Sequence, residues 1–267
     1  MPAPRLPTTT LRRVALVTGA AQGIGRAIAR RLARDGAALV LNDVPARRPA
    51  LEALRAELPR AEVLCADVSD EAQVEGMVRD TVRTLGALDV MVANAGISIP
   101  AGVVGARAED VERTLHVNVL GTFFCYKHAA RQMIAQGRGG RIIGASSECG
   151  KRGYEYMLAY CASKFAVRGM TQSAAAELAR HRITVNAYAP GIIDTNIWDV
   201  FKPEHDSSPE ATAVREVRGL IQTTPVGRIG QPDDVAALVA YLASENSGYM
   251  TGQTVRHSSL APYPSVG

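Results

Sequence analysis

The chain has 267 residues, 47% of them hydrophobic, which suffices for one large domain with a sizeable core. Its net charge is only +4, with acids and bases mixed along the chain, so the composition argues against nucleic-acid binding. No apolar run approaches membrane-spanning length, and residues 1–12 lack the apolar core of a signal peptide. We therefore expect a flexible tail at 1–12, a domain over 13–267 and a cytoplasmic protein without a membrane partner.

Short apolar runs alternate with helical patterns along almost the whole chain. The runs are VALVTG, AALVLND, AEVLCAD, LDVMVANAG, GRIIGAS and ITVNAYAPG. This alternation is typical of repeated βαβ units and predicts a parallel sheet. Proline and acids at 231–234 predict the start of a late helix, and the final strand is expected near 252–255. The predicted fold class is α/β, a Rossmann-like doubly wound parallel sheet with helices on both faces.

The first apolar run leads into a glycine-rich turn and then an amphipathic helix. Gly19, Gly23 and Gly25 have the spacing G-x-x-x-G-x-G, with Gln22 and Ile24 between them. Missing side chains let the backbone turn tightly and approach a pyrophosphate at the positive end of the helix. The pattern predicts a dinucleotide site because a strand precedes it and a helix follows.

Asp43 ends the second apolar run, eighteen residues beyond Gly25. A carboxylate there can accept hydrogen bonds from the adenosine ribose hydroxyls and would repel a 2′-phosphate. Gln22 brings no cation, whereas Arg47 and Arg48 are either a solvated turn or ligands for that phosphate. We interpret them as a solvated turn and expect NAD rather than NADP.

Tyr160 and Lys164 lie four residues apart, and Ser147 precedes the tyrosine by thirteen residues. On a helix, side chains at i and i+4 share one face, so a phenol and an ammonium are neighbours. A nearby cation favours the phenolate and is expected to lower the tyrosine pKa toward neutrality. Such a phenol can donate or accept a proton, although the motif alone is more often an ordinary surface pair.

Several motifs occur together and in a characteristic order between residues 13 and 255. They are TGAAQGIG (18–25), NAG (94–96), Asn118 in HVNVLG, Ser147, YCASK (160–164) and the PG of Pro190 and Gly191. In these motifs the chain resembles the short-chain dehydrogenase/reductase family, of the single-domain NAD(P)-dependent type. Within the family, the segment from 159 to 198 and the later GYMTGQ are most similar to diacetyl and acetoin reductases, also called butanediol dehydrogenases.

The resemblance implies a role for each catalytic residue. Hydride would move between the nicotinamide and the substrate carbon while Tyr160 exchanges the proton on the substrate oxygen, which Ser147 also contacts. Lys164 would hold the nicotinamide ribose, and Asn118 would hold a water that relays the proton. No metal is expected. The cysteines Cys65, Cys125, Cys149 and Cys161 have neither zinc-ligand nor disulfide spacing.

Further cofactor contacts are expected where the remaining strands end. Asp67 and Val68 resemble the residues that contact adenine in the family, although an aspartate there could instead begin a helix. The backbone of Asn94, Ala95 and Gly96 should pass the adenosine ribose. After Pro190 and Gly191, Ile193 and Thr195 should meet the nicotinamide amide.

The substrate side is expected to include a lid over about 192–224, which interrupts the sheet–helix alternation. Trp198 is either packing within this lid or an apolar wall over the substrate. Glu148 either bonds a substrate hydroxyl or faces solvent, and Tyr154 and Met157 are expected to line the other side of the pocket.

The C-terminus departs from the family pattern. Relatives of this type usually follow the last strand with an aspartate and two glycines, whereas this chain has Arg256, His257, Ser258 and Ser259. Serine tolerates positive φ poorly compared with glycine, so the turn is expected to differ. In the family this turn lies near the subunit interface, which bears on the expected homo-oligomer, a tetramer or dimer.

The sequence predicts an oxidoreductase that acts on a carbonyl or secondary alcohol, with a small diketone or hydroxyketone as the favoured substrate. Alternatives are a bulkier secondary-metabolite or terpenoid alcohol, or a sugar alcohol. A non-catalytic NAD-binding regulatory protein is a remote alternative, because such a protein should have lost Ser147, Tyr160 or Lys164.

Overall fold

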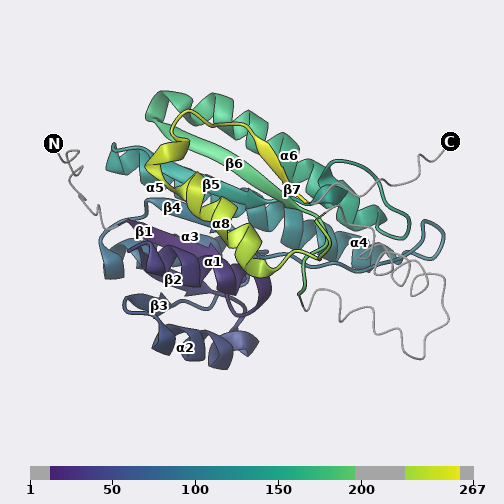
Figure 1. Cartoon of the computed structure of the whole chain (residues 1–267), viewed down its shortest axis with the longest axis horizontal. Helices are drawn as coiled ribbons and strands as arrows, with labels where there is room; N and C mark the ends of the chain where they lie inside the picture. Colours follow the sequence, from purple (N-terminus) through teal and green to yellow (C-terminus); the bar gives the residue numbers. More distant parts are fainter. Residues whose placement is uncertain (1–12, 196–225, 259–267) are drawn as a thin grey trace.

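The computed structural model describes residues 13–195 and 226–258, and its elements follow the predicted alternation of strand and helix (Figure 1). The strands are β1 (Val14–Thr18), β2 (Ala38–Asn42), β3 (Ala61–Val63), β4 (Val90–Ala93), β5 (Gly140–Ala145), β6 (Ile183–Pro190) and β7 (Thr254–His257). The helices are α1 (Gly23–Arg34), α2 (Arg48–Glu57), α3 (Glu71–Leu85), α4 (Ala108–Leu115), α5 (Gly121–Gln136), α6 (Leu158–Leu178) and α8 (Pro232–Ala243).

These strands form one parallel sheet in the order β3-β2-β1-β4-β5-β6-β7. The order reverses beside β1, because β2 and β3 lie on one side of it and β4 on the other. In open parallel sheets, ligands bind beyond the carboxyl ends of the strands at such a reversal. The fold class is therefore the expected doubly wound α/β sheet, and its topology points to the loops after β1 and β4.

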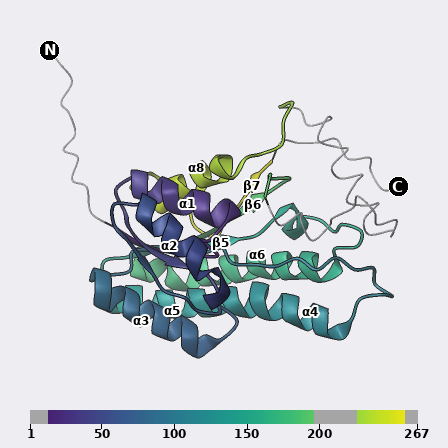
Figure 2. The ribbon, with the colours of Figure 1, turned by 90° about the horizontal axis from the view of Figure 1, so that it is seen from below.

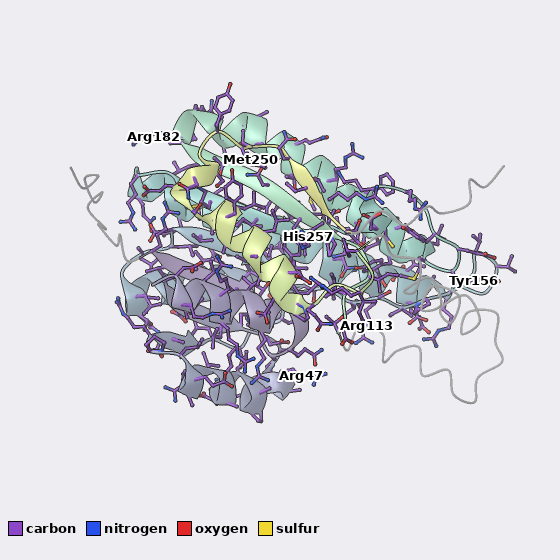
Figure 3. All side chains as sticks on the ribbon, viewed as in Figure 1. Arg47, Arg113, Tyr156, Arg182, Met250 and His257 are labelled. Carbon is purple, nitrogen blue, oxygen red and sulfur yellow. The ribbon has the colours of Figure 1, made fainter. Side chains whose placement is uncertain are left out.

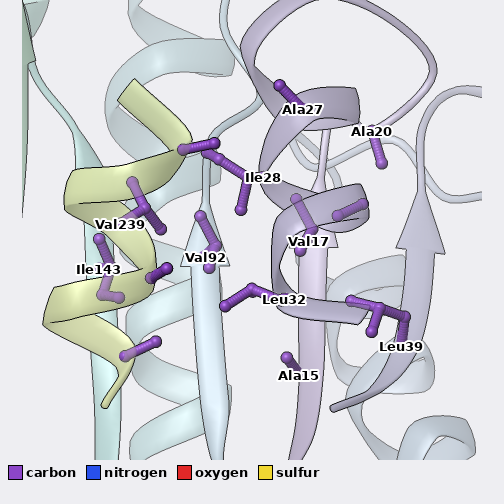
Figure 4. Packing of buried hydrophobic residues seen from close by; sticks show 14 of the residues in the cluster. Ala15, Val17, Ala20, Ala27, Ile28, Leu32, Leu39, Val92, Ile143 and Val239 are labelled. Carbon is purple, nitrogen blue, oxygen red and sulfur yellow. The ribbon is translucent and has the colours of Figure 1, made fainter. Parts of the chain in front are cut away.

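Helices cover both faces of the sheet (Figure 2). On one face, α1, α2 and α8 pack over a buried cluster, and Figure 4 shows Ile28 and Leu32 of α1 facing Val239 of α8 above β4 and β5. On the other face, α3, α5 and α6 enclose a second cluster that includes Met91 and Met133. Because both faces are buried, the central strands are apolar throughout rather than alternating.

Local signals explain where several elements begin and end. Asp70 begins α3, where its carboxylate accepts hydrogen bonds from the Ala72 and Gln73 backbone. The helix α8 begins at Pro232, within the range that the sequence predicted, and Gln231 and Asp234 form a capping box there. The last strand starts at Thr254, two residues later than predicted, and extends through Arg256 to His257. Figure 3 labels His257 at its end. Figure 3 also labels Arg47, which is exposed in the connection to α2.

Candidate active site

The glycine-rich turn between β1 and α1 lies against the backbone that follows β4. A Cβ atom on Gly25 would lie 2.1 Å from the Gly19 carbonyl oxygen and 2.5 Å from the Asn94 amide nitrogen. Gly19 and Gly23 have positive φ angles of 65° and 53°, which suit glycine. The sequence therefore needs glycine here both for the turn and for the close approach of neighbouring backbone.

Hydrogen bonds of Asn94 connect this turn to the middle of the sheet. Its amide nitrogen donates to the carbonyl oxygens of Thr18 and Gly19, at 2.8 and 3.2 Å. Its amide oxygen accepts a 2.7 Å hydrogen bond from the Tyr188 hydroxyl on β6. The Thr18 hydroxyl accepts from the backbone nitrogens of Asn94 and Ala95, each at 3.0 Å. The side chain and the backbone nitrogen of Asn94 thus both hold the turn, so the predicted ligand contact of Asn94 would have to use its carbonyl oxygen.

Asp43 lies at the carboxyl end of β2, beside the glycine-rich turn. One carboxylate oxygen accepts from the Ala21 backbone nitrogen at 3.1 Å, and the other accepts from Val44 at 2.9 Å. Each oxygen retains further acceptor capacity, because a carboxylate has about four lone-pair sites. Arg48 forms a 3.2 Å ion pair with Glu52 on its own helix. Asp43 is thus fixed beside the glycine-rich turn by two backbone donors.

The residues present fit a dinucleotide at this end of the sheet. The first residue of α1 is Gly23, and Gln22 before it makes no side-chain hydrogen bond to the helix start. Backbone N–H groups at such a start can bind a phosphate. A Cβ atom on Gly23 would lie 3.5 Å from the Thr195 methyl group, so Thr195 packs against the glycine-rich turn. Ile24 packs against the core and supports the turn from below.

The other predicted cofactor residues lie at the ends of β3, β4 and β6. The Asp67 carboxylate accepts from the backbone and hydroxyl of Ser69, at 2.9 and 2.7 Å, while Asp70 is the cap of α3. Val68 packs on α5, where a Cβ on Gly121 would meet it at 2.9 Å. Beyond Pro190 and Gly191, the Ile193 side chain is buried against Gly230, with which Ile193 also forms a parallel β-bridge.

The structure separates the two adjacent serines after β5. Ser146 turns inward and its hydroxyl donates to the Lys164 carbonyl at 3.0 Å. Ser147 accepts a 3.2 Å hydrogen bond from the Cys149 backbone, and its hydroxyl also hydrogen-bonds Tyr160. Ser147 is therefore the serine that shares a site with the tyrosine.

Tyr160 and Lys164 lie on one face of α6, as their spacing predicted. The Lys164 ammonium lies 5.3 Å from the centre of the Tyr160 ring and donates a 2.9 Å hydrogen bond to the Ala145 carbonyl. Burial lowers the pKa of Lys164 to about 8. Burial raises the pKa of Tyr160, and the hydrogen bond with Ser147 opposes that rise. The predicted lowering of the tyrosine pKa is therefore wrong for the chain without ligand, because desolvation of the phenolate dominates.

Asn118 lies in a π-helical turn, His116–Leu120, between α4 and α5. Its amide pairs with the backbone of Ile97 in both directions, each at 2.8 Å, and donates to the Ser163 hydroxyl at 3.0 Å. A Cβ on Gly96 would lie 3.1 Å from the Asn118 amide oxygen and 3.3 Å from the Lys164 nitrogen. Because the side chain is engaged, a relay water would have to bind the Asn118 main-chain carbonyl, which already accepts from Thr122 at 2.8 Å.

The predicted substrate residues lie on two segments beside Ser147. Glu148 is buried rather than facing solvent, and both carboxylate oxygens accept hydrogen bonds from Arg256. Met157 pairs with Ala101 across a short bridge and lies 4.0 Å from the Ser98 hydroxyl. The Tyr154 ring lies under the Arg152 guanidinium, at 4.7 Å. Trp198 and nearly all of the predicted lid lie outside the described residues.

Sequence reasoning did not single out the groups that support the site from behind. Thr18, Tyr188 and Ser163 hold Asn94 and Asn118, and Ser146 holds the helix that carries Lys164. Each lies in or beside a predicted strand or motif. Their hydrogen-bond partners are remote in sequence. The only signal that could have identified these supporting residues was the presence of a polar side chain in an otherwise apolar run.

Comparison with known proteins agrees with this geometry. The family model described as enoyl-(acyl carrier protein) reductase matches residues 19–258. A short-chain dehydrogenase/reductase of Armillaria gallica is 49% identical, over 91% of this chain and 93% of the relative. Galactitol 2-dehydrogenase of Agrobacterium fabrum and L-2,3-butanediol dehydrogenase of Corynebacterium glutamicum are each 38% identical, over 91% of this chain and 94% and 96% of the relatives. The crystal structure of levodione reductase superimposes with a TM-score of 0.84 at 34% identity, over 93% of this chain and 96% of that one.

The chain belongs to the short-chain dehydrogenase/reductase family. It is an oxidoreductase that uses a nicotinamide cofactor and transfers hydride between that cofactor and a carbonyl or alcohol. Within the described residues, the helices are too short or too polar to cross a membrane.

Proposed function

We propose that the enzyme is an NAD-dependent alcohol dehydrogenase or carbonyl reductase in which Tyr160 exchanges the substrate proton. The observation that carries this proposal is the meeting of Ser147, Tyr160 and Lys164, with Lys164 close to Gly96 at the end of the sheet where the glycine-rich turn also lies. When bound, the nicotinamide supplies or accepts the hydride. The intact trio also argues against a regulatory protein that binds NAD without turnover.

In this proposal, Ser147 and Tyr160 hold the substrate oxygen between two hydroxyl groups. During reduction Tyr160 donates its proton to that oxygen, and during oxidation its phenolate accepts the proton. Because burial raises the pKa of Tyr160, the phenolate depends on positive charge nearby. Lys164 supplies such charge, and its free donors would bind the nicotinamide ribose. Asn118 would complete the proton relay through a water on its main-chain carbonyl.

The preference for NAD rests on Asp43. Its carboxylate is fixed by two backbone donors at the edge of the phosphate turn, where it can accept from both ribose hydroxyls. A 2′-phosphate at the same position would meet a negative charge. Arg48 pairs with Glu52. This favours the interpretation that Arg47 and Arg48 form a solvated turn and do not bind a 2′-phosphate. Asp67, Val68 and the backbone of 94–96 would complete the adenosine side.

For the substrate, we propose a small ketone with a neighbouring oxygen, such as a diketone or hydroxyketone. The similarity to L-2,3-butanediol dehydrogenase supports this class. A sugar alcohol is the second candidate, because galactitol 2-dehydrogenase is equally similar in sequence. A bulkier secondary-metabolite or terpenoid alcohol is a third possibility, in which Tyr154, Met157 and Trp198 would form an apolar wall.

The proposal is tested by incubating the purified protein with NAD(H) or NADP(H) and a panel of diketones, hydroxyketones, sugar alcohols and terpenoid alcohols. Turnover is followed by nicotinamide absorbance, and products are identified by chromatography. NAD(H)-dependent turnover of the vicinal diketones and hydroxyketones is expected to be fastest. Cofactor binding without turnover of any panel member would favour a regulatory protein.

We also propose that the enzyme is a cytoplasmic homotetramer or dimer with one domain over 13–267 and a lid near 192–224. Exposed apolar side chains on or beside α5 and α6 support self-association, namely Leu120, Phe123, Leu158 and Phe165. Light scattering after gel filtration distinguishes the tetramer, the dimer and the monomer.

A further inference from the structure

An ion pair joins the catalytic loop to the end of the last strand. Arg256 on β7 donates through Nε to Glu148 Oε1 at 2.5 Å and through Nη2 to Oε2 at 2.8 Å. Ser258 adds a 2.7 Å hydrogen bond to Oε1 and accepts from Arg256 Nε at 3.1 Å. Paired bonds from a guanidinium to a carboxylate fix orientation as well as distance. We call Glu148, Arg256 and Ser258 the C-terminal clamp.

The clamp lies next to the catalytic serine. Glu148 follows Ser147 directly, and its side chain is only 11% exposed. The turn that begins at Glu148 is closed by hydrogen bonds from the backbone of Gly150, Lys151 and Arg152 to the carbonyls of Ser147 and Glu148. Whatever fixes the Glu148 side chain therefore also limits the movement of the Ser147 backbone.

Two further contacts connect the same segments. The Lys151 ammonium donates to the Thr254 carbonyl on β7 at 2.6 Å. On the other side, the Gly191 backbone donates to the His257 carbonyl at 3.2 Å, and a Cβ on Gly191 would lie 2.5 Å from the Ser258 Cβ. The C-terminal segment is thus packed against the catalytic loop and the loop after β6. Two of the residues that stand where relatives usually have an aspartate and two glycines, Arg256 and Ser258, belong to the clamp.

We propose that Arg256 and Ser258 are positioning residues, which hold Ser147 through Glu148 and so determine where the substrate oxygen binds. This inference rests on the proposed role of Ser147. It assigns Glu148 a partner within the protein instead of a substrate hydroxyl, because a guanidinium and a hydroxyl of the C-terminal segment bind both of its oxygens and the side chain is buried. The usual aspartate and glycines could not reproduce this arrangement, since they provide neither a guanidinium nor a hydroxyl.

The test compares wild type with Arg256→Gln, Arg256→Lys, Glu148→Gln and the double variant Glu148→Gln/Arg256→Gln. Arg256→Gln is expected to lower kcat by roughly 10- to 100-fold, because a small misplacement of a catalytic group has effects of that order. NAD affinity, measured by calorimetry, should remain within about twofold, because the Arg256 side chain bonds Glu148 and Ser258 and not the glycine-rich turn. Arg256→Lys should recover part of the loss, and the double variant should lose no more than the worse single variant.

Arg138→Gln is the matched control, because it breaks a 2.6 Å ion pair with Asp89 at the opposite ends of the strands. It should retain full kcat. A direct bond from Glu148 to substrate would instead make Glu148→Gln harmful and Arg256→Gln nearly silent. Additive losses in the double variant, or a parallel loss of NAD affinity, would also contradict the clamp.

Amide hydrogen exchange over residues 147–152 provides a readout independent of turnover. Arg256→Gln should increase the exchange rate there several-fold, and Arg138→Gln should not. If the wild-type protein turns over no carbonyl or alcohol, the proposed function is wrong. The exchange experiment then still tests whether the clamp restrains the backbone of residues 147–152. Unchanged exchange overturns the clamp at any level of activity. Faster exchange with undiminished kcat overturns its role in positioning Ser147.

Discussion

Replacing Gly25 by alanine should damage the cofactor site through a steric conflict that the structure defines. The new Cβ would lie 2.1 Å from the Gly19 carbonyl oxygen and 2.8 Å from the Gly19 carbonyl carbon, so backbone must move. Overpacking of this kind typically costs about 1–3 kcal/mol of stability. The displaced turn should also weaken NAD binding by at least tenfold, equivalent to about 1.4 kcal/mol.

Gly76→Ala is the matched control within α3. Its Cβ would approach only the flexible end of Arg79, at 3.5 Å, and alanine favours a helix over glycine by roughly 0.5–1 kcal/mol. Urea unfolding and calorimetric NAD titration of both variants measure the two effects. Gly25→Ala should lose stability and affinity, whereas Gly76→Ala should gain stability and keep wild-type affinity. Wild-type NAD affinity in Gly25→Ala would refute the proposed packing of the turn.

Three further predictions concern cofactor choice, pH and substrate. Asp43→Ala should narrow the preference for NAD over NADP, measured as the ratio of kcat/KM values, and an unmodified enzyme that prefers NADPH would contradict the role of Asp43. The Arg228 guanidinium lowers the pKa of Asp234 from its ordinary value of 3.8 to about 2, so the ionised carboxylate stabilises the fold at pH values above about 4. Asp234→Asn should therefore be less stable than wild type at pH 7 by about 1 kcal/mol, a difference that disappears as the pH falls from about 4 to 2; a pH-independent difference would exclude this ionisation as its cause. Diacetyl or acetoin should have a much higher kcat/KM than butanone, because a site that pairs a substrate oxygen rejects analogues without it, and equal values would exclude the small-diketone substrate.

The fold and the catalytic residues could be predicted because their signals are local. The i, i+4 spacing of Tyr160 and Lys164 places both on one helix face, and the apolar runs identify strands buried on both sides. Gly25 could be predicted for a similar reason, because the glycine spacing of a turn between a strand and a helix is contained within a few consecutive residues. These patterns depend on a few neighbouring positions.

Other features depend on contacts between distant segments. Glu148 and Arg256 are 108 residues apart, so the sequence showed an unusual C-terminus but not its partner. The tyrosine pKa was predicted in the wrong direction because spacing reveals the nearby cation but not the desolvation around the phenol. Ser147 was identified from its motif position, whereas the supporting role of the adjacent Ser146, whose hydroxyl donates to the Lys164 carbonyl, became visible only in the fold.

The central claim is that Tyr160 exchanges the proton on the substrate oxygen, and Tyr160→Phe tests it most directly. Phenylalanine keeps the ring but removes the exchangeable proton. The account predicts that kcat falls by about 10²- to 10⁴-fold, or roughly 3–5 kcal/mol of transition-state stabilisation, while NAD affinity stays near wild type. The measurement is single-turnover hydride transfer in the purified variant, with the NAD dissociation constant determined on the same sample. Near-native hydride transfer by Tyr160→Phe would contradict the account.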